Sequence, residues 1–534
     1  MTADSDANPC SPKEPKSGFW LQTRTFHSLR PRVPLPPLSQ SLSITDYILS
    51  LLLQSSTSTS NTTVLIDSST DRQVSDDEFL SQIQSLSSSL RRSTSLSKGH
   101  VAFILAPPSL HIPVLYFALL ALGVTISPAN PLGSDLEISH QVRLSNPVIA
   151  FATSSTSHKL PRLPLGTVLL DSPEFLSMID DENRPNADPV EPVHVSQSDS
   201  AAILYSSGTT GLVKGVLLTH RNMIALFAGL FGHRLESDRN EAQKKKEPQQ
   251  VSLITVPLFH VFGFFKLMRA VAMGETLVLM GRFDLEVMLK AVEKYKVTHL
   301  PASPPLLVAL TKSELVKKYD LSSLRLLACS GAPLGKDVAL RFVAKFPNVE
   351  IAQGYGLTES GGGGASMEGS EEYSRLYSVG RLTVNMEAKI VDPVTGEALP
   401  PGQKGELWLR GPTIMKGYIG DDKATVEILD SEGWLKTGDL CYFDSDGFLS
   451  VVDRLKELIK YKAYQVAPAE LEHLLLSHPE IADAAVIPYP DEAAGQIPMA
   501  FVVRKAGSNI TEAQVIEFIA KKEGTTGVFV GVLT

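Results

Sequence analysis

The sequence predicts an α/β protein with a large N-terminal domain, a β-rich subdomain and a small C-terminal domain. Its 534 residues exceed what one hydrophobic core usually organises, so two or more domains are expected. From residue 100 to residue 356, strand-like apolar runs alternate with helical patterns, which is typical of largely parallel sheets. After residue 381 the pattern changes to short strands separated by Pro and Gly turns, which indicates the β-rich part.

The first part of the chain predicts an arm, then a helix and a strand. Residues 1–44 are rich in Pro, Ser and Arg and show little periodicity, and the first helix is expected near ITDYILSLLLQ. The run SSTSTSNTT at 55–63 is a predicted surface loop, and HVAFILA is a predicted strand. The apolar stretch at 111–126 is shorter than the roughly 20 residues that cross a bilayer, and it contains Pro113, so we expect a buried core helix.

The middle of the chain continues the alternation of strand and helix. The strands VSLITVPLF, GETLVLMG and VEIAQGYG are expected, with one helix after the first strand and a second helix at LEVMLKAVEKY. The charged segment HRLESDRNEAQKKKEPQQ at 233–250 predicts a solvated loop, with a basic docking patch as the alternative, and we assign it no function.

The last part of the chain predicts a small α/β unit. AELEHLLLSH and TEAQVIEFIAKK are amphipathic and should form helices, with strands at AAVIPYP and MAFVVRK between them. Thr511 and Gln514 form a capping-box pair that opens the last helix, and Val515, Phe518 and Ile519 lie on one of its faces.

Composition narrows the class of protein. The net charge of −9 argues against a nucleic-acid partner held through phosphates, and the mean hydropathy of +0.04 is that of an ordinary globular protein. Cys10, Cys329 and Cys441 are too far apart in sequence for a disulfide framework or a CxxC zinc site. No apolar segment follows a basic start, so we expect no secretory signal and an intracellular enzyme of small molecules.

The stretch LYSSGTTGLVKG at 204–215 predicts a phosphate-binding loop. Glycines let backbone N–H groups approach a phosphate, Ser and Thr add hydroxyl donors, and a lysine adds a cation. The order of Lys214 and Gly215 does not fit a Walker A loop. An ordinary surface turn is the alternative for this stretch taken alone.

Four further motifs follow this loop in order: PLFHVFG (257–263), QGYGLTES (353–360), GWLKTGDL (433–440) and DRLKELIKYKAYQVAPAELE (453–472). With the loop they resemble the adenylate-forming AMP-binding enzymes, above all the 4-coumarate–CoA ligase-like acyl-CoA ligases, over residues 45–523. The resemblance implies stacked mixed sheets flanked by helices and a small mobile α+β C-terminal domain, incomplete here. It implies an N-terminal arm at 1–44, an AMP-binding adenylation domain at 45–453, a partial C-terminal domain at 454–523 and a divergent tail at 524–534.

The reaction implied by the resemblance joins a small-molecule carboxylic acid to ATP with Mg²⁺ and then transfers the acyl group to CoA. The residues implied to bind ATP or AMP are Ser206, Ser207, Gly208, Thr209, Thr210, Lys214, Gln353, Gly354, Tyr355, Gly356, Thr358, Asp439 and Arg454. Glu359 is the implied Mg²⁺ ligand, since hard oxygen ligands suit this ion. The implied adenine shelf joins Gly331–Pro333 to Gln353–Gly356, and Asp439 is implied to accept both ribose hydroxyls.

Further residues are implied to act on the acid and on CoA. His260, Lys460 and Gln465 take the catalytic positions, Lys456 the hinge, Lys462 and Ala463 the CoA path, and Phe262, Phe264, Lys266 and Gly331 the acid pocket. Without the motif context, His260 would be an ordinary packed histidine and the lysines would be surface residues. Phe262, Phe264 and Phe265 fit the core as well as a pocket wall.

Three positions and the final segment depart from the family pattern. Phe262 and Lys266 replace a tyrosine and a serine that meet the ring hydroxyl of hydroxycinnamates, which favours an apolar fatty or jasmonate-precursor acid over a phenylpropanoid acid. Ala463 replaces a glycine beside the CoA path. The final EGTTGVFVGVLT lacks the lysine of the family's SGKILRREL loop, so we expect impaired adenylation and an aggregation-prone tail.

Other interpretations remain open at this point. The resemblance favours a peroxisomal location, but the final residues form no SKL-type signal, so the cytoplasm is the alternative. An adenylating enzyme with another acceptor, or a non-catalytic nucleotide- or acyl-binding remnant, would carry the same motifs. The sequence does not predict the oligomeric state.

Overall fold

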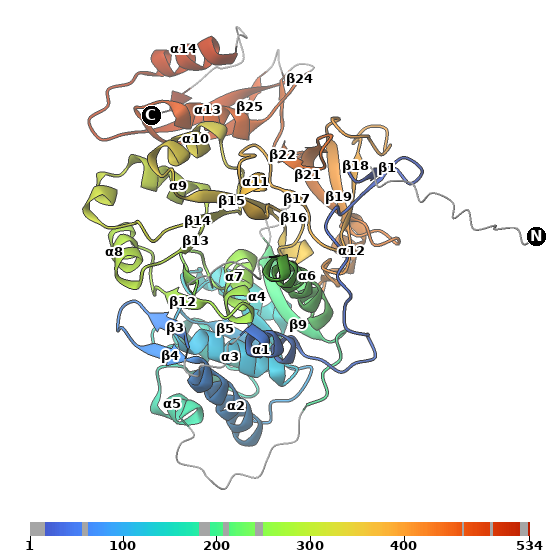
Figure 1. Cartoon of the computed structure of the whole chain (residues 1–534), viewed down its shortest axis with the longest axis vertical. Coiled ribbons are helices and arrows are strands. Elements are labelled where there is room, and N and C mark those ends of the chain that lie inside the picture. The colour runs from blue at the N-terminus through green and yellow to red at the C-terminus, as the bar shows by residue number, and fades with distance from the viewer. Residues whose placement is uncertain are drawn as a thin grey trace, which may run out of the picture.

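A computed structural model describes residues 16–55, 62–180, 193–206, 213–240, 249–461, 464–491, 495–523 and 532–533. The described chain forms four β-sheets with helices between and around them (Figure 1). This is the mixed α/β architecture of stacked sheets, with a β-rich part and a small α+β domain, that the sequence predicts.

The first large sheet has seven strands in the order β20-β10-β9-β6-β5-β7-β8. Strands β5 to β9 are parallel, whereas β10 runs antiparallel to both β9 and β20. The strands are β5 (Val101–Leu105), β6 (Thr125–Pro128), β7 (Ile149–Ala152), β8 (Thr167–Leu169), β9 (Ser200–Ser206), β10 (Lys214–Thr219) and β20 (Gly417–Tyr418).

The second large sheet has nine strands in the order β17-β16-β15-β14-β13-β11-β12-β3-β4. Its six central strands are parallel. The strands are β3 (Thr63–Asp67), β4 (Gln73–Ser75), β11 (Val251–Leu253), β12 (Thr276–Leu279), β13 (His299–Ala302), β14 (Leu326–Cys329), β15 (Glu350–Tyr355), β16 (Ala365–Ser366) and β17 (Arg381–Leu382).

One continuous core joins the two large sheets. It contains buried residues from both sheets and from α1 (Ile44–Ser55), α2 (Asp76–Ser93), α3 (His111–Ala121), α6 (His220–Asn240) and α7 (Val261–Ala272). The predicted core helix at 111–126 is confirmed, since α3 is almost entirely buried. A second core lies under α8 (Leu285–Tyr295), α9 (Pro304–Lys312) and α10 (Lys336–Lys345).

The remaining helices and turns are short and cover the sheets. They are α4 (Asp135–Ser145), α5 (Pro173–Ile179), α11 (Gly369–Tyr373), α12 (Asp422–Ile428) and the 3₁₀ turns η1 (Ser157–Lys159), η2 (Glu314–Lys318) and η3 (Thr358–Ser360). Cys329 and Cys441 are buried and free.

The β-rich part is a six-stranded sheet that includes the N-terminal arm. Its order is β1-β2-β18-β19-β21-β22, with β1 (Phe19–Trp20), β2 (Thr25–His27), β18 (Glu387–Val391), β19 (Gly405–Arg410), β21 (Leu435–Phe443) and β22 (Leu449–Arg454). The expectation of a merely extended arm was incomplete, because β2 pairs with β18 and the Phe26 ring lies 4.3 Å from that of Phe443. Aromatic burial anchors the arm in this sheet.

The small domain has its own sheet and core. It contains β23 (Ile459–Tyr461), β24 (Tyr464–Val466), β25 (Ile481–Asp491), β26 (Gly495–Arg504), β27 (Val532–Leu533), α13 (Pro468–Ser477) and α14 (Glu512–Glu523). The capping pair is confirmed, because the Thr511 N–H donates to Gln514 Oε1 and the Gln514 N–H donates to Thr511 Oγ1. Val515 and Ile519 are buried in its core, and Phe518 packs against it.

The small domain rests on the large domain through α13 (Figure 1). Asp453 accepts a hydrogen bond from the Ala469 N–H at the start of α13, and Arg341 donates to the carbonyls of Leu476 and Ser477 at its end. An anion at the start of a helix and a cation at its end are both favourable. These contacts hold α13 at both ends.

The sequence predicted surface loops at 55–63 and at 233–250. Most of the predicted loop at 55–63 lies outside the described residues. The predicted loop at 233–250 was placed too early, because α6 continues to Asn240. Residues 233–240 contain neither Pro nor Gly, so nothing local stops the helix, and residues 241–248 are not described.

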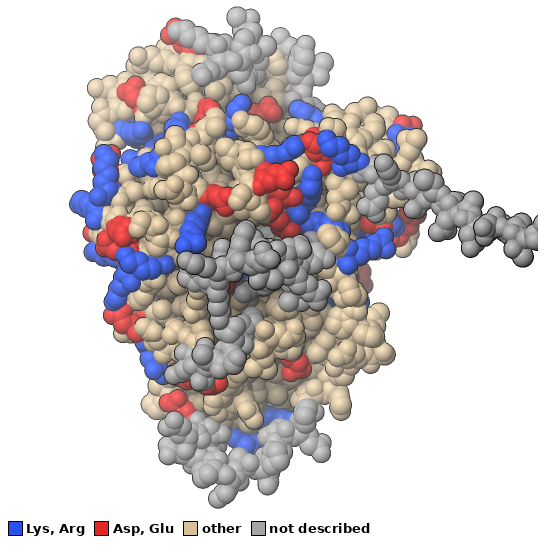
Figure 2. All heavy atoms as spheres, in the orientation of Figure 1, with Lys and Arg blue, Asp and Glu red and all other residues tan. Residues whose placement is uncertain are grey.

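The face of the molecule shown in Figure 2 carries both signs of charge among mostly uncharged side chains. Across the face in Figure 2, Lys and Arg side chains lie interspersed with Asp and Glu side chains. Within the described residues, every helix is too short or too polar to cross a membrane.

Candidate active site

A cavity of about 280 Å³ lies where parallel strands of both large sheets end. Crevices beyond the carboxyl ends of such strands are the usual ligand sites of α/β folds. Its lining residues are Ala129, Asn130, Glu137, Gln141, Tyr205, Ser206, Val213, Phe259, His260, Val261, Gly331, Gly356, Leu357, Thr358, Glu359 and Arg454. We call the side formed by Ser206, Gly331, 356–359 and Arg454 the nucleotide side, and the side formed by 259–261 and the helix α7 behind it the acid side.

Asp439 lies behind the nucleotide side and is held by two side chains. The Tyr355 hydroxyl donates to its Oδ2 at 2.5 Å, and Arg454 Nε lies 3.6 Å from Oδ1. Burial raises the pKa of Asp439 to about 6, although the Tyr355 hydrogen bond and the Arg454 charge oppose this shift. Asp439 and Arg454 face each other across β21 and β22, so the sheet register brings this pair together.

Glu359 lies in the turn η3, buried at the floor of the nucleotide side. Its Oε1 accepts a hydrogen bond from the Tyr418 hydroxyl at 2.7 Å, and its backbone carbonyl accepts the Met415 N–H. No cluster of three His, Cys, Asp or Glu side chains that could hold a metal occurs among the described residues. One carboxylate beside a hydroxyl of Thr358 fits Mg²⁺, which commonly binds proteins through one or two carboxylates together with substrate phosphates.

The expected adenine shelf is only partly at the cavity. Gly331 and Gly356 line it, and a Cβ at Gly356 would lie 2.3 Å from the Gly362 carbonyl oxygen, so only glycine fits there. Gln353 is buried instead, with Nε2 donating to the Leu376 carbonyl. Gly354 is not a lining residue either, and its carbonyl accepts from the Ser330 hydroxyl.

The phosphate loop is described only at its two ends. Ser206 lines the cavity, and Lys214 opens β10 with its Nζ 4.8 Å from the centre of the Tyr418 ring. The expected contacts of Ser207, Gly208, Thr209 and Thr210 lie outside the described residues. Lys214 therefore lies near Tyr418, the same residue that contacts Glu359.

On the acid side, His260 begins α7 and faces the cavity. Its Nδ1 accepts the Phe262 N–H at 3.3 Å, and burial lowers its pKa, so the ring is neutral and carries its proton on Nε2. A Cβ at Gly263 would lie 2.1 Å from the Pro257 carbonyl oxygen. Glycine at this position therefore allows the chain to turn sharply enough to present His260.

The other expected pocket residues differ in their surroundings. Phe264 is in the core, with its ring 5.6 Å from that of Tyr116, and it does not line the cavity. Phe262 and Lys266 are not among the lining residues either, and Lys266 Nζ lies 5.5 Å from the centre of the Phe262 ring. Burial lowers the pKa of Lys266 to about 7, with a further lowering by Arg269, and no hydrogen bond or ion pair joins Lys266 to another described residue.

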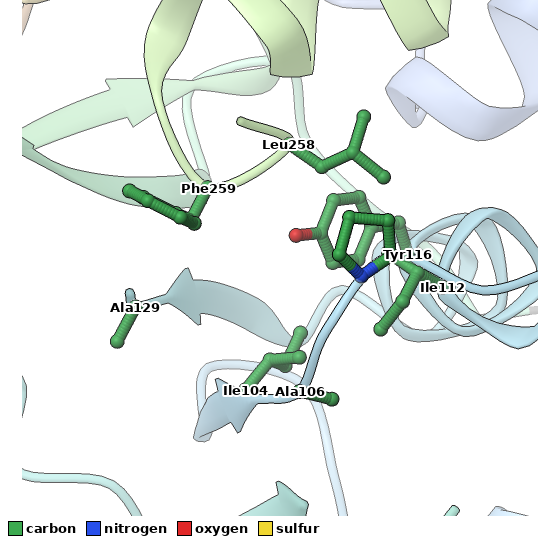
Figure 3. Close-up of a pocket in the computed structure, with 8 residues that line it drawn as sticks. Ile104, Ala106, Ile112, Tyr116, Ala129, Leu258 and Phe259 are labelled. Atoms are coloured by element: carbon green, nitrogen blue, oxygen red, sulfur yellow. The ribbon is translucent and has the colours of Figure 1, made fainter. Parts of the chain in front are cut away.

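A small apolar pocket of about 10 Å³ adjoins the cavity and shares Ala129 and Phe259 with it. Figure 3 shows Leu258 and Phe259 opposite Ile104 and Ala106, with Tyr116 between them. The pocket has room for about one water molecule and extends the acid side toward the core.

The structure does not bring Lys456 or Lys460 of the expected set to the cavity. Lys456 and Lys460 are exposed, and the Lys460 N–H donates to Gln496 Oε1. Gln465 pairs with Lys460 across β23 and β24, but its side chain, and all of Lys462 and Ala463, lie outside the description.

Sequence reasoning missed several cavity residues. Tyr205 and Gln141 line the cavity, and the Tyr205 hydroxyl bonds the Ser127 hydroxyl at 2.6 Å and the Gln141 carbonyl at 3.1 Å. Tyr205 lies within the phosphate-binding stretch at 204–215, directly before Ser206, which could have pointed to it. No local signal marks Gln141 or Tyr418, because tertiary contacts alone bring them to the site.

The chain matches the AMP-binding enzyme family over residues 52–419 and the AMP-binding enzyme C-terminal domain over residues 470–533. It is 60% identical over 515 residues to 4-coumarate–CoA ligase-like 9 of Arabidopsis thaliana, which covers 95% of this chain and 90% of that protein. It is 46% identical over 522 residues to peroxisomal OPC-8:0-CoA ligase 1 of the same plant, with coverage of 95% and 92%.

Solved structures of a CoA synthetase are also similar to this chain. The o-succinylbenzoate CoA synthetase of Bacillus subtilis, in complex with its acyl-adenylate intermediate, is similar with a TM-score of 0.74 and 26% identity, covering 90% of this chain and 94% of that one. The same enzyme with ATP and magnesium ion is similar with a TM-score of 0.73 and 26% identity, covering 90% and 95%.

Proposed function

Since the chain belongs to the family of AMP-binding enzymes, we propose that its substrate is a largely apolar carboxylic acid. The enzyme is an ATP-dependent acid–CoA ligase that works through an acyl-adenylate. The observation that carries the proposal is that the cavity which gathers Glu359, Arg454 and His260 is lined beside His260 by the apolar side chains of Phe259 and Val261. The acid carboxylate attacks the α-phosphorus of ATP and pyrophosphate leaves. The CoA thiol then attacks the acyl carbonyl and displaces AMP.

The nucleotide side orients ATP for the first step. Asp439 accepts the two ribose hydroxyls, while Tyr355 and Arg454 keep its carboxylate aligned. Glu359, with Thr358 beside it, would hold Mg²⁺, which supplies charge neutralisation on the phosphates and the leaving pyrophosphate when bound. Lys214 and the loop at 206–210 contribute further donors to the phosphates.

The acid side positions the attacking carboxylate. The Nε2–H of the neutral His260 points a hydrogen-bond donor at the acid without adding a second charge. Phe259 and Val261 flank His260 and give the acyl chain apolar contacts.

The second half-reaction requires the small domain to move. Rotation about Lys456 breaks the contacts of Asp453 and Arg341 with the two ends of α13, and it brings new small-domain residues to the adenylate. Lys460 and Gln465 face the adenylate in one orientation, and Lys462 and Ala463 border the CoA path in the other. The expectation of impaired adenylation rests on the segment 524–534, almost all of it outside the described residues, and stays a prediction.

The acid is a fatty or jasmonate-precursor acid in preference to a hydroxycinnamate. Phe262 offers no hydroxyl to a ring hydroxyl of the acid, and a polar group buried without a partner costs roughly 1–3 kcal/mol. The similarity to a peroxisomal OPC-8:0-CoA ligase supports both this substrate class and a peroxisomal location, with the cytoplasm as the alternative.

The test is acid-dependent ATP–pyrophosphate exchange together with mass-spectrometric detection of the CoA thioester. The panel contains fatty acids of increasing length, cyclopentanone alkanoic acids and cinnamic acids with and without a ring hydroxyl. Highest kcat/KM with apolar acids is expected. A hydroxycinnamate as the best substrate would overturn the proposed acid class, whereas exchange without thioester formation would point to an acceptor other than CoA.

A further inference from the structure

Tyr418 contacts two groups that the proposed ATP site uses, although no sequence motif pointed to it. Its hydroxyl donates to Glu359 Oε1 at 2.7 Å, and the ammonium of Lys214 lies 4.8 Å from the centre of its ring. Glu359 is the proposed Mg²⁺ ligand, and Lys214 belongs to the proposed phosphate site. One side chain therefore links the two sources of charge compensation for ATP.

The backbone holds Tyr418 firmly on both sides. The Lys416 N–H donates to the Leu217 carbonyl and the Ile419 N–H donates to the Gly215 carbonyl, so β20 is fixed along β10. The Tyr418 N–H donates to the Thr425 hydroxyl at 2.9 Å. Because its backbone is fixed in this way, Tyr418 can determine the positions of the side chains that contact it.

The Tyr418 hydroxyl occupies one oxygen of the Glu359 carboxylate and leaves the other for a cation. Both residues are buried, at 7% exposure each, so loss of this donor would leave the bonded carboxylate oxygen poorly solvated. Partners of this kind fix the orientation of metal-binding side chains.

The ring of Tyr418 acts on the other partner. An ammonium within about 6 Å of an aromatic ring centre is attracted to the ring face. Lys214 has a flexible stem, so this contact restricts where its charge lies at the start of β10.

We propose that Tyr418 is a positioning residue that orients the Glu359 carboxylate for Mg²⁺ through its hydroxyl and the Lys214 ammonium for the ATP phosphates through its ring. The inference rests on the proposed roles of Glu359 and Lys214. It adds that Tyr418 couples the positions of Glu359 and Lys214. The hydroxyl of Tyr418 acts on Glu359 and its ring acts on Lys214, so the two contributions can be separated by substitution.

The test measures binding of a non-hydrolysable ATP analogue by calorimetry at a series of free Mg²⁺ concentrations. Tyr418→Phe removes the hydroxyl and keeps the ring, and the Mg²⁺ concentration at half-maximal binding should rise about tenfold. Binding of AMP without metal should be unchanged. In a Glu359→Gln background the same substitution should have little further effect, because the carboxylate it orients is gone.

The ring contribution is tested with Tyr418→Leu. Compared with Tyr418→Phe, this variant should lose a further factor of about three in analogue affinity at saturating Mg²⁺. In a Lys214→Met background, Leu and Phe at position 418 should bind equally well. Should Tyr418→Leu fail to fold, as judged by thermal unfolding, Lys214→Met in the Tyr418→Phe background measures the same contact.

Tyr319→Phe is the matched control, since the Tyr319 hydroxyl donates to Glu286 Oε1 at the same 2.7 Å and neither residue lines the cavity. Its Mg²⁺ midpoint should equal that of the unaltered protein. An unchanged midpoint in Tyr418→Phe, or an equal shift in Tyr319→Phe, overturns the role of Tyr418 alone. Analogue binding that needs no Mg²⁺ in the unaltered protein would overturn the proposed metal role of Glu359 as well.

Discussion

The two sides of the cavity differ in how their ionisable groups are held. On the nucleotide side, Asp439 is paired with Tyr355 and Arg454, and Glu359 is paired with Tyr418. Behind the acid side, Lys266 contacts the Phe262 ring and has no hydrogen bond or ion pair with another described residue. The paired groups of the nucleotide side thus suit one fixed ligand. On the acid side, a few side chains without such partners set the polarity, and these can be substituted.

The sharpest test of the nucleotide side is Asp439→Asn. Because the proposed ribose contacts are hydrogen bonds to a charged acceptor, worth about 1.5–3 kcal/mol each, we expect ATP affinity to fall about 100-fold. The substitution also gives the Tyr355 hydroxyl a weaker acceptor. Equilibrium binding of ATP measures the loss, and Asp422→Asn, at an exposed site in the first turn of α12, is the control. A loss below threefold would mean that Asp439 does not meet the ribose.

The same carboxylate predicts an unusual dependence on pH. With a pKa near 6, Asp439 is about one-tenth ionised at pH 5, so nucleotide affinity should fall about tenfold between pH 7 and pH 5. Stability should change in the opposite direction. The folded protein holds this proton up to about pH 6, whereas the unfolded chain releases it near its ordinary value of 3.8, so this contribution to stability is full below pH 4 and is lost as the pH rises through 6.

Calorimetric titration and denaturant unfolding at each pH separate the two effects. Both pH dependences should flatten in Asp439→Asn, since that side chain does not titrate. An affinity that falls equally in the variant would assign the titration to another group, such as the nucleotide phosphates.

The sequence predicts the nucleotide side better than the acid side, for a physical reason. Glu359 and Arg454 lie in short motifs at the ends of strands, and their spacing places them at the cavity. The helix α8 was predicted at its observed bounds, because its apolar periodicity is local and Asp284 caps its start. The strand β2 could not be predicted in the same way, because Phe26 is held by a residue more than 400 positions away.

Tyr418 and Gln353 show the same limit within the site. Gln353 lies in a motif that the family uses for adenine, yet its side chain is turned inward to the Leu376 carbonyl. Tyr418 carries no motif signal, yet strand pairing with β10 places it against Glu359. A motif therefore locates a strand end, while the direction of each side chain depends on packing that only the fold supplies.

On the acid side, Lys266→Met should change the preference for acids without changing the use of ATP. Removing a half-buried ammonium that forms no hydrogen bond or ion pair with another described residue should raise kcat/KM for unsubstituted fatty acids about fivefold and leave the KM for ATP unchanged. The thermal unfolding midpoint should rise or stay level. Lys290→Met on the exposed face of α8 is the control. A changed KM for ATP in Lys266→Met would show that the acid side and the nucleotide side of the cavity are not independent.

The smallest expected effect comes from Phe262→Tyr, which restores the ring hydroxyl expected in hydroxycinnamate ligases. One added hydrogen bond is worth about 1 kcal/mol, so kcat/KM for a hydroxycinnamate should rise about fivefold and that for a fatty acid should change little. Combining it with Lys266→Ser should increase the gain, because the ammonium 5.5 Å from this ring no longer competes for the new hydroxyl. Competing-substrate assays measure both ratios. A gain above 100-fold from the single change would mean that one hydroxyl controls the acid side, and that this side is as rigidly specified as the nucleotide side.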